Sequence, residues 1–168
     1  MTPSLLEHYQ SFARYNAWAN RRIYAACEEL PEAEYQKPRR AFFKTIHNTL
    51  NHLVLVDRLY AARLLGRPHG FTALDEELYA DFASLKAARV EEDKAILSLV
   101  DDLKAERLGA TVTYRTIKGE RERSDRVADI LTMLFNHQTH HRGQVHDMLS
   151  QTEVAPPSLD YVYFISEV

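Results

Sequence analysis

Residues 127–148 have the sequence VADILTMLFNHQTHHRGQVHDM, and this stretch decides the fold class. Its apolar side chains recur at steps of three and four residues, which places them on one face of an α-helix: Val127, Ile130, Leu134, Val145 and Met148. Where the apolar stripe is interrupted, its continuation falls on His137 and His141. The pattern therefore predicts an amphipathic helix that ends near residue 151 and carries two histidines on its buried face.

Three other segments have helical patterning. Residues 5–30 repeat apolar side chains at helical spacing and stop before Pro31, while residues 45–65 begin at Thr45, a candidate N-cap, and stop before Gly66. Residues 75–103 are rich in Ala, Glu, Leu and Lys, and a break near residue 80 would divide them into two helices. Mostly short links favour an antiparallel bundle, but the longer link before residue 75 leaves the packing order open.

Residues 109–124 change in character, because β-branched and aromatic side chains replace the helical pattern. Lys118-Gly119 offers a turn between two short runs of this kind, which predicts a β-hairpin. Ser124 or Asp125 then caps the last helix. The expected fold is all-α, a four-helix bundle with a short β-hairpin before the last helix, in a single domain over residues 1–168.

The overall composition excludes several classes of protein. Hydrophobic residues make up 45% of the 168 residues, charged residues 27%, and the net charge is −3, which gives no basic surface for nucleic acid. Cys27 is the only cysteine, so no internal disulfide forms. No signal-peptide pattern opens the sequence and no apolar run is long enough to span a bilayer. We expect a cytoplasmic protein that binds neither nucleic acid nor a membrane.

The pair His137 and His141 is the strongest chemical signal in the sequence. Residues four apart on a helix lie about 40° apart around its axis and one turn along it, so both imidazoles point toward the same place. Buried imidazoles need polar partners, and one metal ion satisfies both. The glutamate of the His-Glu-x-x-His metalloprotease motif is replaced by Gln138, so that kind of protease is not expected.

A stable site needs a third ligand from another helix, and residues 45–65 offer His47 and His52. Periodicity does not separate them. His52 lies mid-helix and is preferred, whereas His47 lies in the first turn, where exposure is expected. For a lone histidine the commoner role is a core residue bonded to a backbone carbonyl. Asn48, one turn before His52, is a candidate to orient a ligand, whereas Arg142 and Gln144 serve either helix packing or substrate binding, and packing is preferred.

Three segments together resemble a known family: NHQTHHRGQ at residues 136–144, YNAWAN at residues 15–20 and NHLVLVDRL at residues 51–59. They are similar to motifs of the DinB-like (damage-inducible DinB and YfiT-like) metal-binding proteins. The resemblance spans almost the whole chain. It implies a four-helix bundle that forms a homodimer, with a metal site made by His52, His137 and His141. Thiol-dependent transferases and a maleylpyruvate isomerase that uses a low-molecular-weight thiol belong to the wider superfamily.

Three neutral histidines leave coordination positions open for water or substrate, as in catalytic zinc sites. The leading hypothesis is an enzyme with one divalent transition metal ion (Zn, Ni or Fe) that activates a bound thiol or water. A thiol S-transferase that uses a low-molecular-weight thiol on a small molecule comes first and a hydrolase second. The alternative is a metal-stabilised bundle without turnover, with a sensing or interaction role in a stress response. The sequence assigns no catalytic residue besides the ligands.

Overall fold

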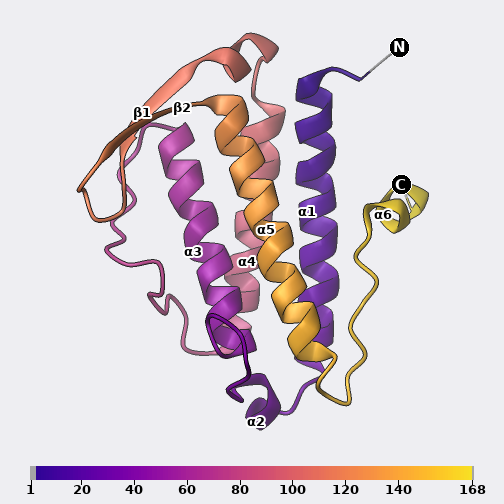
Figure 1. The fold of residues 1–168 in the computed structure, drawn as a ribbon. Helices are drawn as coiled ribbons and strands as arrows, with labels where there is room; N and C mark the ends of the chain where they lie inside the picture. Colours follow the sequence, from indigo (N-terminus) through magenta and orange to yellow (C-terminus); the bar gives the residue numbers. More distant parts are fainter. Residues whose placement is uncertain (1–2, 168) are drawn as a thin grey trace.

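Four long helices form the bundle in the computed structural model, which describes residues 3–167: α1 (Leu5–Glu28), α3 (Ile46–Leu64), α4 (Phe82–Asp101) and α5 (Val127–Leu149). The short helix α2 (Glu32–Tyr35) lies between α1 and α3, and α6 (Tyr161–Glu167) ends the described chain beside α1 (Figure 1). The predicted all-α bundle with a hairpin before its last long helix is confirmed. Residues 1, 2 and 168 of the predicted domain lie outside the described residues.

The helices do not alternate in direction around the bundle. Each of α1 and α3 packs against both α4 and α5. Figure 1 shows that α3 and α4 run the same way, opposite to α1 and α5. The expectation of a wholly antiparallel bundle is therefore wrong for two contacting pairs, α3 with α4 and α1 with α5. Residues 65–81 make the parallel α3–α4 pair possible, because they return along the outside of the bundle before α4 begins.

Side-chain caps set three of the helix starts. Ser4 caps α1 in a capping box with Glu7, Thr45 caps α3 by accepting from the Asn48 amide, and Asp81 caps α4 by accepting from the Ser84 amide. Each oxygen satisfies a backbone N–H group that has no partner within the helix. The cap at Asp81 also explains why α4 begins at Phe82 and not at residue 75.

The hairpin pairs β1 (Thr111–Arg115) with β2 (Glu122–Arg126) in antiparallel register. Gly119 in the connecting turn has a φ of 70°, a conformation that favours glycine. The predicted cap of the last helix at Ser124 or Asp125 is wrong. Both residues belong to β2, because the strand pairing extends as far as Arg126 and keeps them extended, so α5 begins at Val127 without a side-chain cap.

A buried polar layer separates two apolar clusters in the core. Asp57 on α3 accepts a 2.6 Å hydrogen bond from Arg89 on α4, and Arg89 also pairs with Asp93 at 2.9 Å. Arg142 on α5 donates to Asn20 on α1 and to Gln138. Asn20 also donates to Asp93 at 2.8 Å, and Gln138 donates to Asp57. Hydrogen bonds across all four helices thus fix the position of α5 against α3, the two helices that carry the candidate ligands.

The aromatic residues near the C-terminal end of the described chain pack on the bundle. Phe164 of α6 is buried against Tyr15 and Trp18 of α1, and Glu167 accepts a hydrogen bond from the Trp18 indole. Cys27 is buried in the core, and burial raises the pKa of its thiol to about 12, so this cysteine is unreactive.

Candidate metal centre

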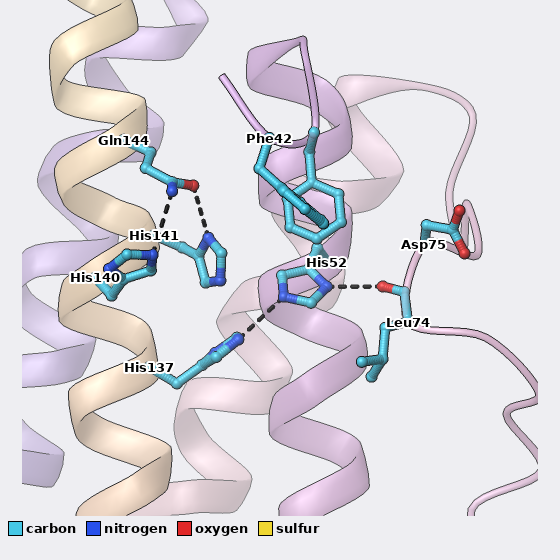
Figure 2. Close-up of a pocket in the computed structure, with 9 residues that line it drawn as sticks. Phe42, His52, Leu74, Asp75, His137, His140, His141 and Gln144 are labelled. Atoms are coloured by element: carbon cyan, nitrogen blue, oxygen red, sulfur yellow. Dashed lines mark hydrogen bonds between the residues drawn. The ribbon is translucent and has the colours of Figure 1, made fainter. Parts of the chain in front are cut away.

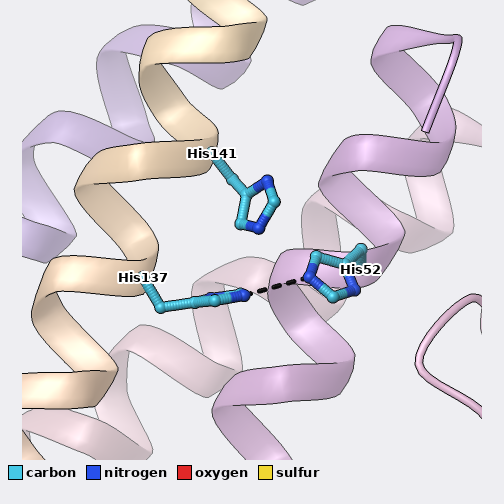
Figure 3. A group of neighbouring side chains, drawn as sticks. All are labelled: His52, His137 and His141. Atoms are coloured by element: carbon cyan, nitrogen blue, oxygen red, sulfur yellow. Dashed lines mark hydrogen bonds between the residues drawn. The ribbon is translucent and has the colours of Figure 1, made fainter. Parts of the chain in front are cut away.

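His52 on α3 meets His137 and His141 on α5 across the bundle (Figure 3). The three ring centroids are 4.4, 4.6 and 4.9 Å apart. Candidate ligand atoms, one from each ring, all lie within 4.8 Å of one another, a spacing that one metal ion could span. The predicted three-histidine set is thus brought together by the fold, with the two α5 residues one turn apart as their spacing requires.

Burial keeps these imidazoles neutral. His52 and His141 are buried and His137 is partly buried. Loss of solvent lowers the pKa of His52 to about 4 and that of His137 to about 3, and it also lowers the pKa of His141. A neutral imidazole has a free lone pair, which is the form that binds a metal ion.

Hydrogen bonds orient two of the rings. The Nδ1 atom of His52 lies 2.7 Å from the carbonyl oxygen of Leu74, and the Nδ1 atom of His141 lies 2.7 Å from Oε1 of Gln144 (Figure 2). Both oxygens only accept, so both Nδ1 atoms carry the hydrogen. The lone pairs of these two neutral rings are therefore on Nε2, as in metal-binding histidines whose other nitrogen donates to a fixed oxygen.

The arrangement around His137 also favours a metal ion between the rings. Its Nε2 lies 3.0 Å from Nε2 of His52, whose lone pair is unprotonated, and its buried Nδ1 has no hydrogen-bond partner among residues 3–167. A cation between the rings would accept a lone pair from each of them. Imidazole ligands suit zinc, nickel and iron, so the donor set fits the expected divalent ion.

The centre opens into a cavity of about 530 Å³. Nine residues line it: Phe42, Phe43, His52, Leu74, Asp75, His137, His140, His141 and Gln144. The ring of Phe43 stacks on that of His52 at a centroid distance of 4.0 Å, and Asp75 places a carboxylate on the wall (Figure 2). The histidines therefore face a space that can admit a small molecule, and core side chains do not enclose them.

His47 does not join the cluster, and the expectation that it is exposed is wrong. It is 1% exposed, because its Nδ1 bonds to the Tyr35 hydroxyl and its Nε2 pairs with Glu77, both at 3.0 Å. His47 and His52 are five positions apart, which turns them about 140° around the helix. Only His52 can face α5.

Asn48 does not orient a ligand. Its side chain is exposed on α3, and its recorded hydrogen bond is from its backbone amide to Thr45. Gln144 has that role instead: its amide accepts from His141 and donates to Nε2 of His140 at 3.2 Å. The assignment of Gln144 to helix packing is therefore incomplete. Gln144 lies three positions after His141 and four after His140, so all three side chains share one helix face. This spacing was the sequence signal that could have predicted the contact of Gln144 with the two histidines.

Asn51 also helps to arrange the candidate metal centre, and the sequence analysis did not identify it. Its Oδ1 accepts from the backbone amides of Leu78 and Tyr79, both at 2.9 Å, and its Nδ2 donates to the Tyr79 carbonyl at 3.1 Å. These bonds attach residues 72–79 to α3. The same segment carries the Leu74 carbonyl, so Asn51 indirectly orients the neighbouring His52.

These features define a class of protein, a four-helix bundle with a three-histidine cluster in an open cavity. The chain belongs to the DinB family, whose family model matches residues 1–167. It is 26% identical to the protein DinB of Bacillus subtilis (strain 168) over 158 residues, 90% of each chain. A crystal structure of a DinB-like protein from Bacillus cereus ATCC 10987 has a similar fold, with a TM-score of 0.66 and 17% identity over 88% of this chain and 94% of that one.

Proposed function

We propose that this protein binds one divalent transition metal ion (Zn, Ni or Fe) through His52, His137 and His141 and acts as a metal-dependent enzyme on a small molecule. A thiol S-transferase that uses a low-molecular-weight thiol is our first candidate and a hydrolase the second. The observation that carries the proposal is the position of three neutral imidazoles on the wall of an open cavity. A divalent ion bound there would lower the pKa of a coordinated thiol or water and so supply a nucleophile.

Residues around the centre have separable roles in this proposal. Leu74 and Gln144 hold the two imidazole hydrogens away from the centre. Phe43 covers one face of His52 and keeps water from it. Asp75 is the carboxylate that lines the cavity, and we assign it to accept the proton that the nucleophile releases.

The alternative to an enzyme is a metal-stabilised bundle without turnover, with a sensing or interaction role in a stress response. One observation favours it: the candidate ligands come from two helices, so a bound ion would link α3 to α5. We rank this alternative below the enzyme, because a purely structural site has no need of a cavity in front of its ligands.

Metal analysis of tag-free protein tests the site. We expect a single ion per chain in the wild type and in His146→Ala, and a large loss in His141→Ala. His146 is the matched control, because it is a partly buried histidine of α5 that does not line the cavity. Equal metal content in His141→Ala and the wild type would rule out this centre.

Turnover needs a separate test. Metal-loaded protein is mixed with low-molecular-weight thiols and a panel of electrophiles, and thiol consumption is followed beside metal-free protein and His141→Ala. Metal-dependent consumption supports the transferase, and metal-dependent hydrolysis of ester or amide members of the panel supports the hydrolase. If the protein binds the ion but catalyses neither reaction, the result would favour the metal-stabilised bundle without turnover.

We also propose that the protein is a cytoplasmic homodimer that binds neither nucleic acid nor a membrane. In residues 3–167, no helix is both long and apolar enough to cross a membrane. Three large apolar side chains of α6 are exposed and are available to a second subunit: Val162, Tyr163 and Ile165. Light scattering coupled to size-exclusion chromatography measures the oligomeric state, and a monomer at all concentrations would contradict the homodimer.

A further inference from the structure

A second cavity meets the metal centre from the hairpin side. It has a volume of about 360 Å³, and His52 and His137 form part of its wall, so both cavities share these two rings. Five of the ten other lining residues have aliphatic or thioether side chains, from α3, α5, the hairpin turn and the segment before α4: Val56, Leu59, Leu74, Ile117 and Met133. A molecule that lies in this cavity therefore has one end at the candidate ligands and its body against hydrocarbon.

Arg63 supplies the positive charge at the other end of the cavity. Its guanidinium carbon lies 4.2 Å from the ring centroid of Tyr114 and 5.3 Å from that of Tyr60, so two aromatic rings hold it in place. Its buried Nε has no hydrogen-bond partner in the part of the chain that the structure describes. Within residues 3–167, no carboxylate forms an ion pair with it.

The neighbouring charges explain why Arg63 stays unpaired. Asp125 is close enough for Arg63 to lower its pKa, but its oxygens already accept from Tyr114 and, in a bidentate pair, from Arg123. Arg123, which also lines the cavity, is thus neutralised by direct contact, whereas Arg63 is not. A guanidinium that is fixed but has no anion offers a planar fork of donors to a carboxylate.

One face of α3 connects the two ends. His52, Val56, Leu59 and Arg63 follow one another at steps of four, three and four, the spacing of neighbours on a helix surface. The helix rises about 16 Å from His52 to Arg63. A ligand that reaches from the centre to the guanidinium is therefore extended, with a continuous apolar body between its two ends.

We infer that this cavity binds a small carboxylate with an extended apolar body, whose carboxylate pairs with Arg63 and whose far end lies at His52 and His137. The inference rests on the proposed function for the reaction at that far end, because it names the substrate class of the same centre. Capture of the carboxylate by Arg63 needs no metal, so the two proposals can fail separately.

Isothermal titration calorimetry with straight-chain carboxylates from butanoate to decanoate, and with 3-phenylpropanoate, tests the inference. Octanamide is the neutral match for octanoate. We expect the carboxylates to bind, and octanoate to bind more tightly than octanamide. Arg63→Gln should weaken octanoate binding roughly ten- to hundredfold, the usual effect of losing a charged hydrogen bond, and leave octanamide unchanged. Arg67→Gln, at an exposed arginine outside the cavity, should change neither.

A second variant protects the test against misfolding of Arg63→Gln. Ile117 is partly exposed in the hairpin turn, so Ile117→Asp adds a negative charge to the wall without emptying the core. It should weaken octanoate more than the neutral Ile117→Asn does. Absence of binding for every acid, equal binding of octanoate and octanamide, or octanoate binding that neither Arg63→Gln nor Ile117→Asp weakens would overturn the inference.

Titrations of both metal-loaded and chelator-treated protein separate the two proposals. Arg63-dependent octanoate binding in a protein that takes up no metal would remove the proposed function and keep the carboxylate site. If the protein takes up metal, His141→Ala abolishes this uptake, and octanoate binds no better than octanamide, the metal centre is kept and the carboxylate site is ruled out.

Discussion

The Nε2 atoms of His52 and His137 lie 3.0 Å apart although 85 positions separate the two residues in the chain. One belongs to α3 and the other to α5, so any ion that both imidazoles bind must hold these helices together. The unfolded chain does not keep the two rings close, and the binding of such an ion would therefore be coupled to folding.

Zinc should raise the melting temperature of the wild-type protein as its concentration increases. A ligand that binds only the folded state stabilises it by about 2.7 kcal/mol at one hundred times its dissociation constant. His137→Ala should show little of this shift, and His146→Ala, on α5 but outside the cavity, should show all of it. Thermal unfolding followed by circular dichroism measures the effect, and an undiminished shift in His137→Ala would contradict the role of His137.

Gln144→Met should lower zinc affinity roughly ten- to hundredfold, the usual cost of removing a residue that orients a ligand. The substitution keeps the length of the side chain but removes the oxygen that accepts from His141. Gln144→Glu keeps an acceptor and should retain most of the affinity. Competition with a chromogenic chelator gives the dissociation constants, and equal values for Gln144→Met and the wild type would show that this hydrogen bond is dispensable.

Asn51→Leu should free the segment that carries the Leu74 carbonyl. It removes two bonds accepted by Oδ1 and leaves the Leu78 and Tyr79 amides without partners. Unsatisfied buried groups cost about 1–3 kcal/mol each. Hydrogen exchange should accelerate at these two amides and zinc affinity should fall. Asn51→Asp, which keeps both acceptor bonds, is the control and should protect the amides better. Unchanged exchange in Asn51→Leu would refute the proposed attachment.

Acid should weaken the hairpin through Asp125. Hydrogen bonds from Arg123 and Tyr114 hold the pKa of Asp125 below its ordinary value. A carboxyl whose pKa is lower in the folded state stabilises the fold above its unfolded pKa, about 4, and loses this contribution as the pH falls through the folded pKa. Urea unfolding at a series of pH values should thus show a smaller loss of stability below pH ~4 in Asp125→Asn than in the wild type. Parallel pH curves would count against this interaction.

Much of this protein follows from local patterns in its sequence. The stripe of residues 127–148 predicts α5 and places His137 and His141 on the same face, because a regular helix fixes the angle between residues four apart. Thr45 marks the start of α3, and Lys118-Gly119 marks the turn of the hairpin. These are short-range properties of backbone geometry and capping, so they need no knowledge of the rest of the chain.

Tertiary structure decided what depends on contacts between distant segments. In the sequence, periodicity leaves His47 and His52 both open, and His52 is preferred for its mid-helix position and for the family resemblance around it. In the structure the choice follows from their 140° separation around α3 and from which side α5 occupies. The Leu74 carbonyl, the Asn51 contacts with residues 78 and 79, and the unpaired Arg63 depend on the paths of residues 65–81 and of the hairpin. Helical periodicity describes one element's faces, whereas packing of the whole chain determines what each face meets.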